Sequence, residues 1–223
     1  MERLLFKGNA TVKYTILLLI VAISFFQLTM SINPLPGIIK QLIFTIFPVV
    51  AWFLLDKDSF RALFSRLTFK GTTKAVLWAL AGNLIGFIVS FVFILVVGKD
   101  KITGNPIAES AQTWFHWVVN FIQLFGEEIL SVAVLLVVYA IFRSYVSNRM
   151  ATIIGVIICA IVFALLHLST YGWNVMQVVS ILVIPRIIMN YMFLRAEKKP
   201  SIISSWITHS IYDGLAFILT AIV

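Results

Sequence analysis

The chain has 223 residues, of which 61% are apolar and only 12% are charged, against about 25% charged residues in an ordinary soluble domain. A soluble protein needs more charged surface than this, and a disordered one needs less hydrophobicity, so the composition excludes both classes. In a membrane protein, the net charge of +8 indicates topology rather than nucleic-acid binding. The single cysteine, Cys159, excludes an intrachain disulfide and a cysteine-based zinc knuckle.

Seven stretches are apolar and long enough to cross a bilayer, which takes about 20 residues. The first has a basic lead, as a signal peptide does, but no small-residue cleavage site follows and residues 33–36 form a typical turn sequence. We therefore expect a retained anchor. Without a visible repeat or linker, the sequence predicts an all-α polytopic bundle of about seven helices in a single domain, residues 1–223. The predicted spans are Tyr14–Ile32, Ile38–Leu55, Ala75–Val97, one within Trp114–Phe142, Ala151–Leu168, Val175–Leu194 and Ile202–Ile222.

The basic residues predict the orientation of these spans. With the N-terminus inside, thirteen of the 17 Lys and Arg residues fall on the inner side, and the outer loops hold Lys99 and Lys101. Such an asymmetry is typical of a cytoplasmic N-terminus, and we expect a multi-pass protein of a bacterial cytoplasmic membrane. The thirteen are Arg3, Lys7, Lys13, Lys57, Arg61, Arg66, Lys70, Lys74, Arg143, Arg149, Arg195, Lys198 and Lys199.

The segment between the second and third spans, residues 56–74, is too polar to cross a membrane. Its apolar residues Phe60, Leu63, Phe64 and Leu67 follow helical spacing. They predict an amphipathic helix in the membrane interface, in preference to a docking surface for a partner.

Six ionisable residues remain inside the predicted spans. On insertion scales each costs about 2.5–3.5 kcal/mol at the centre of a spanning helix, so such residues usually face the protein interior. One alone could belong to an ion-pair network that only holds helices together. Three carboxylates and two imidazoles together indicate a functional site. The six are Glu127, Glu128, His167, Arg186, His209 and Asp213.

The fourth span carries a polar stripe at spacings of four, three, four and four residues, which places its members on one helical face. Because the neighbouring residues are almost all apolar, we expect Glu127 to face an internal, wet cavity, with Asn120 and Gln123 beside it. Glu128 is turned about 100° away and must be paired or protonated. His116 is expected in the membrane interface. The stripe consists of His116, Asn120, Gln123, Glu127 and Ser131.

Two later spans carry similar patterns. Ser205, His209 and Asp213 follow one another at intervals of four residues on the seventh span. Arg186 and Asn190 share a face of the sixth span. These intervals place each set on one side of its helix, where it can face the glutamates of the fourth span.

The sequence Glu127-Glu128, then Phe163-x-x-x-His167, then His209-x-x-x-Asp213, in this order on successive spans, resembles the CPBP family. This is the group of CAAX proteases and bacteriocin-processing (Abi) intramembrane endopeptidases, and the resemblance covers about residues 121–219. It implies that Glu127 deprotonates a water that His167 helps to hold, and that His209 and Asp213 stabilise the oxyanion. A partly desolvated carboxylate suits general-base catalysis, and donors aimed at the developing oxyanion lower the barrier.

The chain departs from the family pattern at two positions. The first family motif is EExxxR, and Val132 stands where its Arg would pair with Glu128. We predict that Arg186 pairs with Glu128 instead. Asp213 stands where the family often has Asn, and an Asp donates a hydrogen bond only when protonated. Counted along their spans, Glu127 and His209 would also differ in depth by about 10 Å.

These features predict an intramembrane glutamic-type endopeptidase with a CPBP-like core in about residues 114–222 and no cofactor or metal. The expected substrate is a membrane-associated peptide or protein, such as a pheromone or bacteriocin, and the lipid bilayer is the other partner. Nucleic acid is not expected. The predicted catalytic residues are Glu127, Glu128, His167, His209 and Asp213, supported by Arg186, Asn120, Gln123 and Asn190.

Three other functions stay open at this point. A non-catalytic membrane protein that gives bacteriocin immunity is the main alternative, and Val132 favours it. A zinc protease could use Glu127, His167 and His209 as ligands, although no HExxH is present. A transporter comes last, because the chain shows neither paired broken helices nor an inverted repeat.

Overall fold

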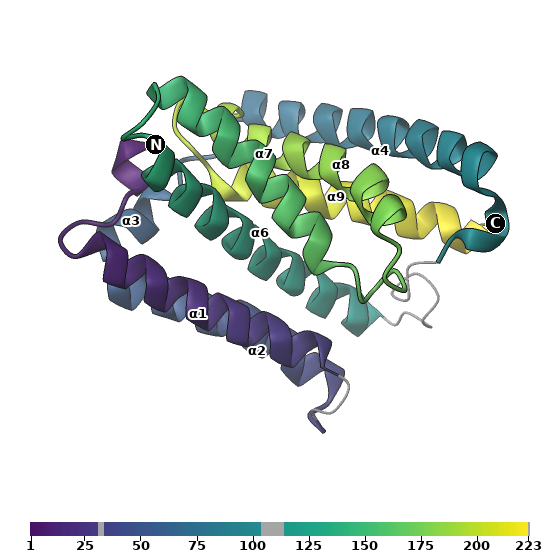
Figure 1. Cartoon of the computed structure of the whole chain (residues 1–223), viewed down its shortest axis with the longest axis horizontal. Coiled ribbons are helices and arrows are strands. Elements are labelled where there is room, and N and C mark those ends of the chain that lie inside the picture. Colours follow the sequence, from purple (N-terminus) through teal and green to yellow (C-terminus); the bar gives the residue numbers. More distant parts are fainter. Residues whose placement is uncertain (31–33, 104–113, 223) are drawn as a thin grey trace.

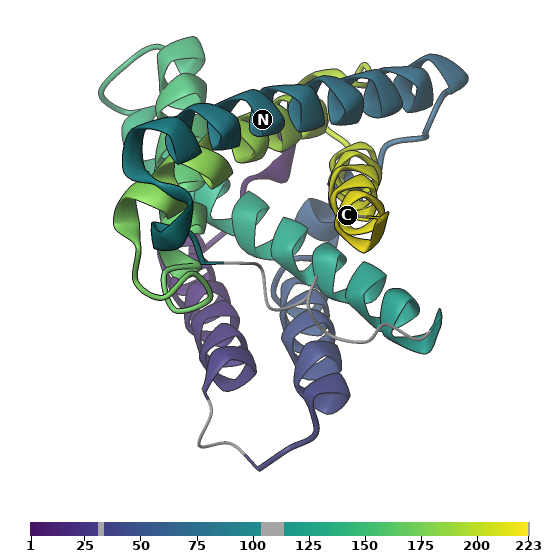
Figure 2. The ribbon, with the colours of Figure 1, turned by 90° about the vertical axis from the view of Figure 1, so that its right-hand side faces the viewer.

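The computed structural model describes residues 1–30, 34–103 and 114–222, with the backbone alone for Asp100 and residues 216–222. Every regular element in these residues is a helix (Figures 1 and 2), so the predicted all-α fold is confirmed. The long helices of this part of the chain are α1 (Ala10–Thr29), α2 (Gly37–Leu55), α4 (Phe69–Val97), α6 (Trp114–Phe142), α7 (Asn148–Leu166), α8 (Val175–Arg195) and α9 (Ile202–Ile222). The short ones are η1 (Glu2–Leu4), α3 (Lys57–Ala62) and η2 (Lys99–Lys101).

Each long helix overlaps one of the predicted spans, with bounds that differ by up to six residues. Within the described residues six of them, α1, α2, α4, α6, α7 and α8, are long and apolar enough to cross a membrane. The remaining one, α9, has a comparable length of 21 residues and carries the polar residues Ser205, His209 and Asp213. The chain is therefore a multi-pass membrane protein. The predicted end of the first span at Ile32 and the turn residue Asn33 lie outside the described residues.

Helix α6 occupies the centre of the bundle. It packs against α1, α2, α7 and α9, and a larger share of it is buried than of any other candidate span in the described chain. In Figure 1, α1 and α2 lie side by side below α6, and α4, α8 and α9 lie above it. Residues along α6 can therefore meet partners from both halves of the chain.

Two glycines permit the close approach of helices around α6. A Cβ on Gly126 would lie 2.8 Å from Thr45 Oγ1 of α2, and one on Gly155 of α7 would lie 3.2 Å from the Leu135 carbonyl oxygen of α6. Small residues serve this purpose in membrane bundles. Thr45 Oγ1 also donates to the Ile122 carbonyl oxygen at 3.1 Å. This contact fixes α2 against the turn of α6 that precedes Glu127.

The segments predicted to be cytoplasmic gather at one end of the bundle. The N-terminus, α3 and the turn between α6 and α7 lie together there (Figure 1). Lys7 Nζ pairs with Asp58 at 3.2 Å, and Ser65 Oγ donates to the Lys199 carbonyl oxygen at 3.2 Å. Thr68 N donates to Glu197 Oε1 at 2.7 Å. The basic segments therefore share one end, and a cytoplasmic location of that end remains a prediction.

The predicted interfacial helix over residues 56–74 is wrong in its extent. Only Lys57–Ala62 forms a separate helix, and α4 begins at Phe69. Leu63 is fully buried, and its carbonyl oxygen accepts from Ile202 N at 2.9 Å, so the chain turns into the core instead of following the interface. Thr68 then caps α4, because its hydroxyl accepts from Gly71 N at 3.0 Å.

Candidate active site

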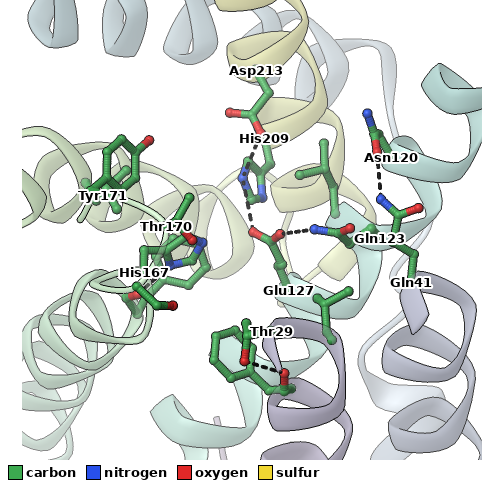
Figure 3. A pocket seen from close by; sticks show the side chains of 16 residues that line it. Thr29, Gln41, Asn120, Gln123, Glu127, His167, Thr170, Tyr171, His209 and Asp213 are labelled. Carbon is green, nitrogen blue, oxygen red and sulfur yellow. Dashed lines mark hydrogen bonds and ion pairs between the residues drawn. The ribbon is translucent and has the colours of Figure 1, made fainter. Parts of the chain in front are cut away.

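A cavity of about 430 Å³ lies among α1, α2, α6, α7, α9 and the loop after α7. Figure 3 shows its polar side chains converging from these elements. Polar residues from the fourth, fifth and seventh predicted spans meet here, as the polar stripes indicated. The predicted site residues that line it are Asn120, Gln123, Glu127, His167, His209 and Asp213.

Glu127 lies on the cavity wall, with 8% of its surface exposed. Its Oε1 accepts from Gln123 Nε2 at 3.1 Å, one helical turn away, and its Oε2 lies 3.8 Å from His209 Nε2. Asn120, a further turn away, accepts from Gln41 Nε2 of α2 at 2.9 Å. The predicted stripe on α6 is thus confirmed at the cavity. His116 is exposed near the start of the helix, and its position in the membrane interface remains a prediction.

Glu128 points away from the cavity and has no exposed surface. Its Oε2 accepts from Arg186 Nη2 at 2.7 Å and from the Ser205 hydroxyl. The Arg186 guanidinium also lies over the Phe163 ring, 4.9 Å from its centroid. The predicted pair between Arg186 and Glu128 is confirmed. Val132, which replaces the motif Arg, is buried in the apolar core.

His209 bridges the two glutamates. Its Nδ1 lies 2.8 Å from Glu128 Oε1, and because a carboxylate paired with Arg186 can only accept, Nδ1 carries a proton. Its Nε2 is presented to the cavity, 3.8 Å from Glu127 Oε2 and 3.6 Å from Asp213 Oδ2. The buried carboxylate therefore fixes which ring nitrogen of His209 faces the chemistry.

The expected difference in depth between Glu127 and His209 is absent, because α9 begins inside the bundle. Ser201 and Ile202 have no exposed surface, and Ser201 N donates to the Phe193 carbonyl oxygen of α8 at 2.8 Å. The turn between α8 and α9 is thus drawn inward. This displacement brings His209 to the level of Glu127.

His167 is the C-cap residue of α7 and lies across the cavity from Glu127 (Figure 3). Its Nδ1 lies 2.8 Å from the Phe163 carbonyl oxygen, which can only accept, so Nδ1 donates. Nε2 is then the nitrogen with a lone pair. The ring also packs on Phe163, with centroids 4.5 Å apart. Phe163 thereby orients His167 and lies beneath Arg186.

Two of the predicted supporting residues, Arg186 and Asn190, do not line the cavity. The position of Asn190 is explained by its contacts. It is fully buried, its Nδ2 lies 3.4 Å from the Val156 carbonyl oxygen, and its Oδ1 lies 3.8 Å from Cys159 Sγ. Asn190 therefore helps to pack α7 against α8. Its shared face with Arg186 places it one turn further from the site.

Five polar residues of the cavity were missed from the sequence: Thr29, Gln41, Ser169, Thr170 and Tyr171. Gln41 gave a signal, since it is a carboxamide inside an apolar predicted span, whereas the loop residues gave none. Burial, and then the carboxylates of Asp213 and Glu127, raise the pKa of the Tyr171 hydroxyl to about 12. This hydroxyl is therefore a neutral donor at the cavity wall.

The described residues do not fit a zinc site. No group of three or more His, Cys, Asp or Glu in that part of the chain is arranged to hold a metal ion. Of the ligand set considered for zinc, Glu127 Oε2 and His209 Nε2 lie 3.8 Å apart, whereas His167 lies across the cavity from Glu127 (Figure 3).

Comparison with known protein families gives a match over the part of the chain that holds the candidate site residues. The family model described as type II CAAX prenyl endopeptidase Rce1-like matches residues 109–215. Neither a search of curated proteins nor one of solved structures gave a match. The matched segment contains every motif residue from Glu127 to Asp213, so the predicted resemblance to the CAAX protease family is confirmed there.

Proposed function

Since residues 109–215 match the family model of type II CAAX prenyl endopeptidases, Rce1-like, we propose that the protein is an intramembrane endopeptidase of the glutamic type. It hydrolyses a peptide bond by direct attack of water, without a covalent intermediate. One observation carries this proposal. Of the two adjacent glutamates, Glu128 is fully engaged with Arg186, Ser205 and His209, while Glu127 faces a cavity with room for substrate and water.

In the proposed reaction, Glu127 is the general base and His167 positions the water. The Glu127 carboxylate accepts a proton from the water as its oxygen bonds to the peptide carbonyl carbon. The lone pair on His167 Nε2 accepts the other hydrogen of the water, which orients it between the two walls. The π electrons of the carbonyl move to its oxygen, and a tetrahedral oxyanion forms.

His209 is the proposed donor to this oxyanion. It donates from Nε2 only as the imidazolium, and the carboxylates of Glu127 and Asp213 lie 3.8 and 3.6 Å from that nitrogen, close enough to attract its positive charge. Asp213 adds a second donor when protonated. Fixed donors of this kind supply much of the barrier reduction in acyl transfer. The oxyanion then collapses, the C–N bond breaks, and the proton held by Glu127 passes to the leaving nitrogen.

The proposed substrate is a peptide or protein associated with the membrane, of the pheromone or bacteriocin type, in a bacterial cytoplasmic membrane. A cavity of about 430 Å³ admits a short extended segment and excludes a folded domain. Its polar wall of carboxamides suits a peptide backbone, since each amide both donates and accepts.

The test of this function is cleavage of co-expressed candidate peptides by the wild type and by Glu127→Gln. We expect the product to disappear in the variant. The matched control is Glu2→Gln, the same change at an exposed position at the other end of the bundle. An undiminished product from Glu127→Gln at equal expression contradicts the assignment of the base.

The non-catalytic immunity protein remains the second candidate. It drew support from Val132, which removes the motif Arg, but Arg186 now pairs with Glu128 in its place. This alternative predicts that protection survives Glu127→Ala combined with His167→Ala at normal expression. Loss of protection in that double variant supports catalysis.

A further inference from the structure

We infer that the substrate enters the cavity from the non-cytoplasmic face of the membrane, so that exported peptides and outward-facing juxtamembrane segments form the substrate class. This inference rests on the proposed function for the cleavage itself. The side of access rests on two further observations, the place where the cavity opens and the distribution of basic residues.

The cavity opens at the end of the bundle remote from the N-terminus. Thr29, the last residue of α1, and Ser169, in the loop after α7, line the cavity and are exposed. The inner lining is much less accessible, with 8% of Glu127 and 4% of His209 exposed. Exposure thus falls from the mouth at Thr29 and Ser169 towards the reactive carboxylate.

The other end of the bundle is packed along the continuation of the same face of α6. Ser131, Leu135 and Tyr139 follow Glu127 at helical spacing, and each has 1% or less of its surface exposed. Beside them, the buried pair of Glu128 and Arg186 joins α6 to α8. These residues close the route from Glu127 towards the basic end.

The charge pattern assigns the two ends to the two sides of the membrane. The thirteen basic residues lie in or beside four segments at the packed end (Figure 1), namely the N-terminal segment, residues 56–74, the α6–α7 turn and the α8–α9 turn. None of the cavity-lining residues is Lys or Arg. Positive charge marks the cytoplasmic side. The mouth of the cavity therefore faces outward.

A row of carboxamides leads from this mouth to the reactive centre. Gln41, in the second turn of α2, donates to Asn120 at 2.9 Å, and Gln123 donates to Glu127 at 3.1 Å. Each carboxamide has a donor and an acceptor to exchange with an extended backbone. A chain segment that reaches the membrane in extended form from outside can follow this row to Glu127.

The first experiment maps the side on which the cavity opens. The chain has one cysteine, and Cys159 is 1% exposed, so a single new cysteine can be labelled selectively. Ser169→Cys and Ser144→Cys form a matched pair, because both serines are exposed and they flank the two ends of α7. In sealed right-side-out vesicles, a membrane-impermeant maleimide should label Ser169→Cys, and label Ser144→Cys only after permeabilisation. The reverse pattern overturns the inference.

The second experiment follows cleavage from each side, with water-soluble quenched fluorescent peptides of mixed sequence as the probe. We expect cleavage by detergent-solubilised protein and by right-side-out vesicles, its loss in inverted vesicles, and its loss everywhere in Glu127→Gln. Cleavage by solubilised protein and inverted vesicles alone overturns the outward access and leaves the proposed function standing. Absence of cleavage by solubilised protein counts against the proposed function, and the labelling pattern still decides the side of access.

Discussion

Glu127 and Glu128 are neighbours in the chain, yet they belong to two different regions of the molecule. Glu128 lies in a closed cluster with Arg186, Ser205 and His209 and has no exposed surface. Glu127 lies on the wall of an open cavity, where Gln123 holds one of its oxygens. The difference shows that the role of a carboxylate at membrane depth depends on what the neighbouring helices bring to it.

The closed cluster around Glu128 orients His209 towards the open cavity around Glu127. A buried ion pair contributes little net stability, since the desolvation of both charges offsets their attraction. Here the pair holds a carboxylate against His209 Nδ1 at 2.8 Å, which aims Nε2 at the cavity. We therefore expect substitution of Glu128 to lower the stability of the fold and substitution of Glu127 to lower the rate of hydrolysis.

The largest effect on stability is expected from Arg186→Met. This change leaves Glu128 buried without its cation, and breaking such a pair costs about 3–5 kcal/mol. Unfolding of the detergent-solubilised protein would measure the loss. The control is Arg149→Met, at an exposed position, which should unfold as the wild type does. Equal stability of Arg186→Met and the control would contradict the closed cluster.

A smaller effect is expected when both charges of the pair are removed. In Glu128→Gln with Arg186→Met, no uncompensated charge remains, so the double variant should be more stable than the sum of the single changes predicts by about 0.5–3 kcal/mol. The four unfolding free energies of the double-mutant cycle measure this coupling. Strict additivity would show that the two side chains do not interact.

On the open side, Gln41→Leu should weaken substrate binding without affecting the chemistry. The loss of one neutral hydrogen-bonding group, worth about 0.5–1.5 kcal/mol, raises KM by about 2–10-fold and leaves kcat nearly unchanged. The control is Gln27→Leu, since Gln27 donates to the Lys40 carbonyl oxygen at 2.7 Å and does not line the cavity. A fall in kcat instead would place Gln41 in the reaction itself.

The smallest effect concerns Asp56, a carboxylate outside the spans. Burial acts to raise its pKa, but the N–H groups of Lys7 and Ser59 and the Lys13 ammonium outweigh burial and hold the pKa below its ordinary value. The stabilisation is therefore complete above about pH 4 and is lost as the pH falls through the lower pKa of the folded state. Acid unfolding curves should show this loss for the wild type and not for Asp56→Asn.

Asp58→Asn is the matched control for the acid titration, because the Asp58 side chain is 70% exposed in its pair with Lys7 and exposed pairs contribute little. It should retain the wild-type dependence on pH. The same dependence in Asp56→Asn would mean that another group carries the effect.

Much of the fold could be predicted because membrane helices are determined by local hydropathy. Ile202–Ile222 was predicted with the bounds that the structure has, and the fourth span was placed within Trp114–Phe142, the whole of which forms α6. The segment 56–74 was not, because the burial of Leu63 and its bond to Ile202 depend on a turn more than a hundred residues away.

In the candidate site, too, the features set by local sequence could be predicted, and those set by distant contacts could not. The stripe of Asn120, Gln123 and Glu127 follows from helical spacing, and the partner of Glu128 follows from the need to pair a buried charge. The common level of Glu127 and His209 could not be predicted, since it depends on the inward turn before α9. Tyr171 carries no local pattern, and only its loop's position over the cavity brings it to the site.

The most direct test of the division between the two glutamates compares Glu127→Gln with Glu128→Gln, measuring turnover and unfolding on the same preparations. We expect Glu127→Gln to lose about 10²–10⁴-fold in turnover, because it lacks the general base, and to unfold as the wild type does. Glu128→Gln should lose stability, since Arg186 is left buried without its anion. Wild-type turnover in a folded Glu127→Gln would contradict the account.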